Sequence, residues 1–529
     1  MIAVLLAMYS RIKNPRGLRG IFIDSFLPQI LGSFTRECTE QFGDNVENFL
    51  KERDIKSLDQ FITHSTETSE LFNSFLRSIH VDPKFLALFA SAEKLRKFLS
   101  TWLDKYGHNS IARTATLHIC FEGISILAAK SIEWTRPGAG YIELSTRYVD
   151  MSGKDLYPVE NELRILGVHP DFCDEVSEES KRCFEVYKSL EGDAWNGPLP
   201  QFLAKQYQNI IPVDKLKQGV IGETCDLLGN ILPCSTLTSL GGSFSGESLV
   251  TLIQHLWMDM LPETNAIAEA IIAEANKVGA NQFLRHLETT PWQEAMWNYL
   301  SPVNGTQASF SVIPSLAYTE KALMSVLTLQ EELWKSKSIE EVIRILSLNP
   351  RGEYDKLPRE FETVSVGFYG GMSFRGWRDL QRMGLCAHKR GLVSAFNGFY
   401  TYTKPAPQVL IEAFNHIHLK NGSIETRLLY AAKTHRENDR KTMRAIMQYP
   451  LVLGNMVPFY MTGNLRQMEF CNWQRSKPSV NHEVREVFLS FEYELRNAYP
   501  WWGKISRADT TPAYVFARGD SDIPLSKVT

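Results

Sequence analysis

The sequence lacks any apolar run close to the 18 or so residues that a membrane-spanning helix requires. The apolar segment nearest the start, residues 2–8, is too short, and neither a basic segment nor a small-residue cleavage site flanks it. We therefore expect this segment to form an opening β-strand rather than a signal peptide. These features predict a cytoplasmic protein with no membrane partner.

The chain also has no excess of charge of either sign. Its 57 Lys and Arg residues face 60 Asp and Glu residues, which gives a formal net charge of −3. General nucleic-acid binders hold the phosphate backbone with a broad positive field, so we expect no nucleic-acid partner here. Any anionic ligand must instead meet a local cluster of cationic side chains.

Metal-binding patterns are equally scarce. The eight cysteines form no CxxC pair and no Cys/His run at zinc spacing, so reduced thiols and no metal site are expected. His416 and His418 are close together, but two imidazoles on what we expect to be one strand face are weak evidence for a metal. The motifs of phosphate loops, dinucleotide folds, zinc proteases and serine hydrolase elbows are absent too.

Apolar periodicity predicts a helix-rich α+β protein built from two related halves. In each half a helix, a proline and a second helix follow one another near the end. The predicted helices span residues 247–257, from 262 onward, 465–474 and 481–499. A Pro-Val-Asn-Gly-Thr stretch resembles a linker, and it divides the chain into units of residues 1–303 and 304–529.

The segment from Glu143 to Tyr148 is the densest polar stretch of the sequence. In an extended backbone Glu143, Ser145 and Arg147 would point to one side, because alternate residues of a strand share a face. An acid, a hydroxyl and a cation on one edge suit a small phosphorylated ring. A solvated face of an amphipathic strand would produce the same pattern.

A second polar cluster lies on the predicted helix around residues 465–474. Asn464 and Arg475 are eleven residues apart, which places them on one helical face about three turns apart, while Arg466 points nearly opposite. One face could therefore reach a ligand and Arg466 another partner. Solvated arginines on an amphipathic helix would also explain this spacing.

Together these pieces resemble the flavin-dependent thymidylate synthases, whose central motif is RHRxxSxNExSxRY. The resemblance rests on GHxS at residues 107–110, ExSxRY at 143–148, Arg382, NLR at 464–466, Arg475 and NHEVR at 481–485. The pieces span most of the chain, which resembles two family units fused head to tail. The first unit keeps ExSxRY, and the second keeps NLR and the later arginine.

The departures from the family pattern are complementary. In the first unit the RHR part falls on Thr135, Arg136 and Pro137, and Ile142 replaces the motif asparagine. In the second unit Arg382 resembles the first arginine of RHR, but no ExSxRY follows. The resemblance implies that parts from both units combine into shared sites. Because family members resemble homotetramers, it also implies a homodimer of this chain that forms a pseudo-tetramer.

The resemblance further implies reductive methylation of dUMP to dTMP. Methylenetetrahydrofolate, a folate, would donate the carbon, NADPH would be the reductant and FAD the hydride carrier. Arg147 and Arg475 would act on the phosphate and ring oxygens, and substrate binding would also involve Glu143, Ser145 and Tyr148. Candidates for the FAD or folate side are His108, Arg136, Arg382, Asn464 and Arg466.

Three alternatives fit the same residues. The first is flavin-dependent alkylation of another pyrimidine nucleotide such as UMP, because Ile142 could reshape the pocket. The second is a non-catalytic nucleotide- or flavin-binding protein that keeps the fold for assembly. The third is a purely structural helical protein, in which Arg147 and Arg475 would contact no ligand.

Overall fold

The fold was analysed in a computed structural model. Residues 24–78, 110–300, 323–328, 339–517 and 523–527 are described, apart from short gaps at 26, 68, 135–137, 148, 278–279, 285–286, 350, 354 and 436. The expected strand at residues 2–8 and the unit boundary at 303/304 lie outside the described residues.

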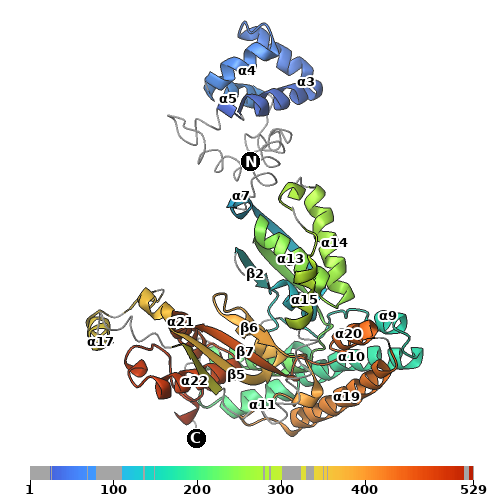
Figure 1. Cartoon of the computed structure of the whole chain (residues 1–529), viewed down its shortest axis with the longest axis vertical. Helices are drawn as coiled ribbons and strands as arrows, with labels where there is room; N and C mark the ends of the chain where they lie inside the picture. Colours follow the sequence, from blue (N-terminus) through green and yellow to red (C-terminus); the bar gives the residue numbers. More distant parts are fainter. Residues whose placement is uncertain are drawn as a thin grey trace.

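Three helices close to the N-terminus form a small core of their own, coloured blue in Figure 1. The rings of Phe61 and Phe75 lie 4.9 Å apart at its centre, and Phe49 packs edge-on against both. The helices are α3 (Leu27–Glu52), α4 (Leu58–Glu67) and α5 (Ser69–Ser78).

The first sheet has three antiparallel strands in the order β1-β3-β2. Phe121, Leu240 and Phe244 on one face of this sheet pack against the two helices that follow β3. The strands and their helices are β1 (Thr116–Ser125), α8 (Ile126–Ile132), β2 (Ala139–Glu143), β3 (Leu237–Ser245), α13 (Gly246–Met258) and α14 (Pro262–Lys277).

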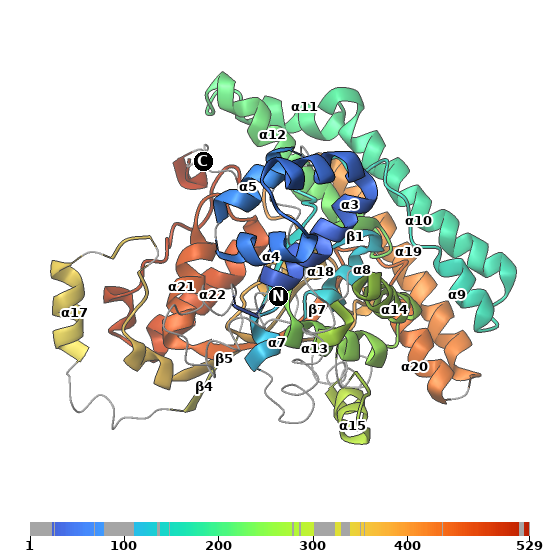
Figure 2. The same cartoon turned by 90° about the horizontal axis from the view of Figure 1, so that it is seen from above.

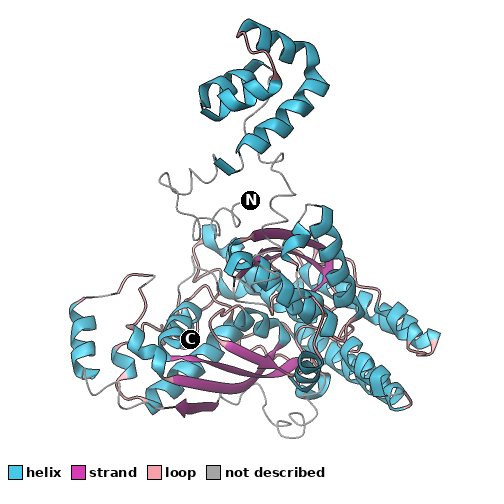
Figure 3. Ribbon diagram, turned by 45° about the horizontal axis from the view of Figure 1, so that its top comes forward, coloured by secondary structure: helices cyan, strands magenta, loops and turns pink. Residues whose placement is uncertain are grey.

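The second sheet repeats this order with one additional strand, as β4-β5-β7-β6. Both sheets are visible in magenta in Figure 3. The elements are β4 (Leu323–Thr328), β5 (Ser365–Ser373), α18 (Phe374–Gln381), β6 (Ala387–Arg390), β7 (Met456–Asn464), α21 (Leu465–Ser476) and α22 (His482–Ala498).

Further helices connect the strands. Helices α10 and α19 lie side by side (Figure 1 and Figure 2), and Arg427 of α19 pairs with Glu175 of α10 at 2.7 Å. The remaining α-helices described are α7 (Ser110–Thr114), α9 (Val159–Ile165), α10 (Pro170–Glu191), α11 (Pro198–Tyr207), α12 (Val213–Leu228), α15 (Pro291–Leu300), α17 (Ile339–Leu348), α19 (Gln408–Lys433) and α20 (Glu437–Ile446).

The first sheet with its helices and the second sheet with its helices form two regions of the structure. The same hydrogen-bonded clamp occurs once in each region. Ser125 caps α8, and its N–H and hydroxyl donate to the Glu263 carboxylate of α14 at 2.7 and 2.6 Å. Ser373 caps α18 in the same way, and its N–H and hydroxyl donate to Glu483 of α22. One clamp ties α8, which follows β1, to α14, and the other ties α18, which follows β5, to α22.

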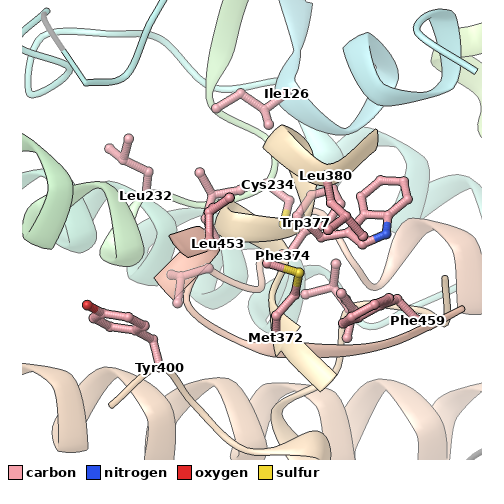
Figure 4. Packing of buried hydrophobic residues seen from close by; sticks show 14 of the residues in the cluster. Ile126, Leu232, Cys234, Met372, Phe374, Trp377, Leu380, Tyr400, Leu453 and Phe459 are labelled. Carbon is pink, nitrogen blue, oxygen red and sulfur yellow. The ribbon is translucent and has the colours of Figure 1, made fainter. Parts of the chain in front are cut away.

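The segments before β3 and β7 join the two regions. Cys234 N–H donates to the Leu451 carbonyl at 2.8 Å, and Leu453 N–H donates to the Leu232 carbonyl at 2.9 Å. Figure 4 shows the apolar core around this junction, where Ile126, Leu232 and Cys234 lie near Phe374, Trp377 and Leu453. One hydrophobic core therefore contains residues from both regions.

Mixed helix and sheet agree with the expected α+β class, and the periodicity located the four closing helices α13, α14, α21 and α22 within a few residues. One expectation was wrong, because His416 and His418 lie on helix α19 and not on a strand. Leu410, Phe414 and Ile417 form a buried helical stripe there. Among the described helices, none is both long and apolar enough to cross a membrane.

The clamp at Glu483 predicts a measurable pH effect on stability. Burial raises the pKa of Glu483 to about 7, although the Ser373 donors act in the opposite direction. A raised carboxyl pKa stabilises the fold below the unfolded value of 4.5, and this contribution is lost as the pH rises through 7. Glu483→Gln should therefore flatten the fall in unfolding free energy between pH 4.5 and 7.5 by about 3 kcal/mol.

Urea denaturation at a series of pH values measures this slope. Glu494→Gln, which changes a residue of the same helix that is not among the groups shifting the Glu483 pKa, is the matched control and should keep the wild-type slope. An unchanged slope in Glu483→Gln would show that this carboxyl is not the group responsible.

Candidate functional site

A buried carboxylate at the end of β2 joins the two regions electrostatically. Glu143 accepts hydrogen bonds from Lys130 at 2.7 Å, from Arg378 at 2.7 Å and from Arg382 at 2.9 Å. Burial alone would raise the pKa of Glu143, but these three cations hold it well below its ordinary value. Lys130 belongs to α8, whereas Arg378 belongs to α18 and Arg382 directly follows it.

The backbone is not extended across Glu143, Ser145 and Arg147, so the expectation that it would be was wrong. Strand β2 ends at Glu143, and the chain turns at the next residues. The Ser145 hydroxyl accepts a hydrogen bond from the Arg147 N–H at 3.2 Å, a local bond that favours a turn. The three side chains therefore do not line one edge of a strand.

Arg147 is held firmly by groups that are distant in the sequence. Its Nε and Nη2 both donate to the Asp226 carboxylate at 2.9 Å, and Nη2 also donates to the Ala517 carbonyl at 3.1 Å. Asp226 accepts a further hydrogen bond from Arg375 at 2.9 Å. Gly229 makes room for this arginine, because a Cβ there would lie 2.4 Å from the Arg375 Nε.

Arg475 approaches the same place from helix α21. Its Nη2 donates to the Asp379 main-chain carbonyl at 3.4 Å, and burial lowers its pKa. The Nε atoms of Arg375, Arg378 and Arg475 are buried and have no hydrogen-bond partner among the described residues. A buried N–H without a partner is costly. The Arg375 Nε packs against Gly229, so the Nε atoms of Arg378 and Arg475 are the donors that favour an acceptor supplied by a ligand.

Asp379 on α18 lies within the field of arginines from both regions. Partial burial would raise its pKa, but Arg475, Arg382, Arg147 and Arg375 together lower it. Arg147 and Arg475 therefore act on one carboxyl group. We call Arg147, Arg375, Arg378, Arg382 and Arg475 the arginine cluster.

The arginine cluster has an excess of positive charge. With Lys130 it contains six cations, and the carboxylates that contact or surround them are Glu133, Glu143, Asp226 and Asp379. Glu483, whose pKa is raised to about 7, also interacts with Arg375, so one to two positive charges are left without a matching carboxylate near neutral pH. An arrangement of this kind suits an anion with two negative charges, such as a phosphate monoester.

Two of the predicted residues have roles within the fold. Asn464 caps α21, because its side-chain oxygen accepts a hydrogen bond from the Gln467 N–H at 2.8 Å. Arg466 donates to the Leu357 carbonyl at 2.6 Å and pairs with Glu362. These partners direct Arg466 away from Arg475, as the helical spacing predicts. His108, Arg136 and Tyr148 lie outside the described residues.

Sequence reasoning named Arg382 but missed Arg375, Arg378, Asp379 and Asp226. The four charged residues Arg375, Arg378, Asp379 and Arg382 follow the spacing 3, 4 and 7, which puts them on one helical face. That pattern could have identified α18 as a charged face. Asp226 gives no such signal, because its two arginine partners are 79 and 149 residues away in the sequence.

Comparison with known proteins finds a family match for part of the chain. Residues 60–279 match the Thy1 family, which is described as thymidylate synthase complementing protein. The chain is a relative of these proteins. Within the match lie β1 to β3 and the Glu143–Tyr148 motif, whereas Arg375 to Arg382 and Arg475 lie beyond it.

Longer relatives extend the similarity across both regions. A UPF0159 protein of Thermoplasma acidophilum is 23% identical over 461 residues, which cover 79% of this chain and 90% of the relative. A UPF0159 protein of Chlamydia muridarum is 24% identical over 77% of this chain and 80% of its own. One from Chlamydia pneumoniae is 25% identical over 58% of this chain and 62% of its own. No solved structure matches the chain.

The contacts of Glu143 with three cations predict that this carboxylate is important for stability. Glu143→Gln would leave Lys130, Arg378 and Arg382 without a charged partner, which should cost about 3 kcal/mol of unfolding free energy near neutral pH. Because the folded pKa is lowered, the wild-type contribution exists above pH 4.5 and declines as the pH falls below it. The difference in unfolding free energy between Glu143→Gln and wild type should therefore become smaller as the pH falls below 4.5.

Chemical denaturation of both proteins at neutral and acidic pH measures this difference. Glu122→Gln, on an exposed position of β1, should change the unfolding free energy by less than about 0.5 kcal/mol. A Glu143→Gln variant as stable as this control would contradict the interpretation of Glu143 as the shared counter-ion.

Proposed function

We propose that this chain is a flavin-dependent thymidylate synthase that converts dUMP into dTMP, with methylenetetrahydrofolate as carbon donor and NADPH as reductant. The observation that supports it most is the setting of Asp379: the Arg382 Nη1 lies 3.6 Å from its carboxylate, Arg475 donates to its carbonyl at 3.4 Å, and these two arginines lower its pKa together with Arg147. These arginines occupy the motif positions that the resemblance assigns to substrate and cofactor. Their uncompensated charge matches the dianionic phosphate of dUMP.

We further propose that residues 1–303 and 304–529 are two related units. The repeated strand order and the repeated Ser–Glu clamps support this division. Ser245 caps α13 and Asn464 caps α21, the equivalent helices of the two units. Leu256 lies eleven residues after Ser245, and Arg475 lies eleven residues after Asn464, so the two positions correspond. The first unit therefore has no arginine at the place of Arg475.

The second unit has lost the complementary part. Glu143 pairs with Leu240 and Arg390 pairs with Phe459, and both partners lie five residues before their helix cap. Arg390 therefore takes the place of Glu143 in the second unit. One composite site per chain follows from these two exchanges, and two chains would form the pseudo-tetramer that the resemblance implies.

In this proposal Arg475 binds the substrate most directly. Its unpartnered Nε can donate to the phosphate or to a ring oxygen, whereas Asp226 and Ala517 fix the orientation of Arg147. Carbon 5 of uracil becomes nucleophilic when the ring takes an enolate-like form, in which negative charge develops on a ring oxygen. A fixed donor aimed at such a charge typically contributes on the order of 3 kcal/mol. Ser145 serves in binding, because its hydroxyl contacts the Arg147 N–H and no base adjoins it in the sequence.

The expected flavin site fits the chain in part. Arg382 is 42% exposed and lies in the arginine cluster, so its guanidinium can contact a phosphate of FAD. Asn464 and Arg466 do not fit this role, because both side chains already form hydrogen bonds within the fold, Asn464 with the Gln467 N–H and Arg466 with the Leu357 carbonyl. When bound, the flavin would supply hydride chemistry that no side chain can provide.

The argument for UMP as the substrate was that Ile142 reshapes the pocket, and the position of Ile142 in one chain does not support it. Ile142 is 82% exposed, and neighbouring residues of a strand face opposite sides. Ile142 therefore points away from the side on which Glu143 meets the arginines. Its replacement of the motif asparagine does not reshape the arginine cluster of the same chain.

A tritium-release assay on carbon-5-labelled dUMP tests the proposed reaction. With FAD, methylenetetrahydrofolate and NADPH, the wild-type protein should release tritium, and Arg475→Gln should lower the rate by about 100-fold or more. Arg466→Gln is the matched control, since it removes an arginine of the same helix that faces Glu362. Its rate should stay within about threefold of wild type.

Two results would contradict the proposal. Absence of tritium release from the wild-type protein would reject the reaction. Equal rates for Arg475→Gln and Arg466→Gln would show that Arg475 has no role in the reaction.

A further inference from the structure

The carboxylates of the arginine cluster differ in how completely their oxygens are used. Glu143 accepts three cationic donors, and Asp226 accepts two from Arg147 and one from Arg375. The Asp379 carboxylate accepts no hydrogen bond from the residues that the structure describes. Its nearest charged partner is Arg382, whose Nη1 lies 3.6 Å away, beyond hydrogen-bond distance.

Asp379 also differs in exposure. Its side chain is 23% exposed, compared with 0% for Glu143 and 4% for Asp226. A ligand bound at the arginine cluster can therefore reach this carboxylate but not the other two. Asp379 is thus an accessible hydrogen-bond acceptor among groups that only donate.

We infer that Asp379 accepts a hydrogen bond from the N3–H of a uracil ring whose phosphate the arginine cluster holds. This inference rests on the proposed function and adds to it a residue that determines base specificity. Arginines alone attract any phosphorylated base, because all of their polar atoms are donors. Uracil presents a donor at N3, whereas cytosine presents an acceptor there, so the carboxylate favours the first and repels the second.

The size of this discrimination follows from what a mismatch would leave unpaired. Sites that accept a hydrogen bond from a substrate N–H strongly reject analogues that lack it, because the buried acceptor of the protein is then left without a hydrogen bond. Asp379 is partly exposed, so we expect a smaller preference for dUMP over dCMP, on the order of 100-fold.

The other role open to Asp379 is that of a simple counter-ion for the arginines. Removing a counter-ion would raise the affinity for every anion by the same factor, which includes inorganic phosphate. Loss of a base-reading acceptor would instead change the ratio between two nucleotides. The ratio therefore distinguishes the two roles without depending on absolute affinity.

Isothermal titration of the full-length protein with dUMP, dCMP and inorganic phosphate makes this test. Wild-type protein should prefer dUMP over dCMP by about 100-fold. In Asp379→Asn the preference should fall below about tenfold, because an amide can donate as well as accept. Phosphate affinity should stay equal or rise, which also verifies that the variant is folded. Asp379→Ala should lose the preference in the same way.

The inference is overturned if the dUMP-to-dCMP ratio is the same in wild type and Asp379→Asn. It is also overturned if wild-type protein binds both nucleotides equally, in which case Asp379 meets a shared group such as a ribose hydroxyl. Wild-type protein that binds neither nucleotide would overturn the proposed function together with the inference.

Discussion

The buried carboxylate of Glu143 is the interaction on which the rest of the site depends. One acid balances Lys130 from the first region and Arg378 and Arg382 from the second. An unpaired charge at this depth would be far more costly than the pair is favourable, so Lys130, Arg378 and the acid must be buried together, while Arg382 contacts the acid from an exposed position. This requirement fixes α8 against α18 and brings the arginines of the second region to the end of β2.

The two regions share their framework but not their chemistry. The Ser125–Glu263 and Ser373–Glu483 clamps are the same in both, because each satisfies a helix N-terminus and a buried acid at once. The positions that face the arginine cluster differ, as Leu256 and Arg475 illustrate. Packing and hydrogen-bond satisfaction apply to both sheets, whereas a ligand site needs only one copy of each part. This difference would allow one chain to combine a repeated framework with the single composite site that we propose.

Local periodicity was enough to predict the closing helices, because each buries an apolar stripe with helical spacing, as α13 does with Leu249, Leu252 and Leu256. The motif at residues 143–148 also located one edge of the site. The sequence could not predict that Glu143 faces inward, since its cations are 13, 235 and 239 residues away. The same holds for Arg147, whose partners Asp226 and Ala517 depend on the tertiary fold. Charge spacing along α18 was a usable signal that the motif comparison left aside.

A structure of the protein determined with bound dUMP tests the account most directly. The account predicts the nucleotide phosphate or ring within hydrogen-bond distance of both Arg147 and Arg475, the two arginines that surround Asp379 from opposite regions. A nucleotide bound elsewhere on the protein, with the arginine cluster free of ligand, would contradict it.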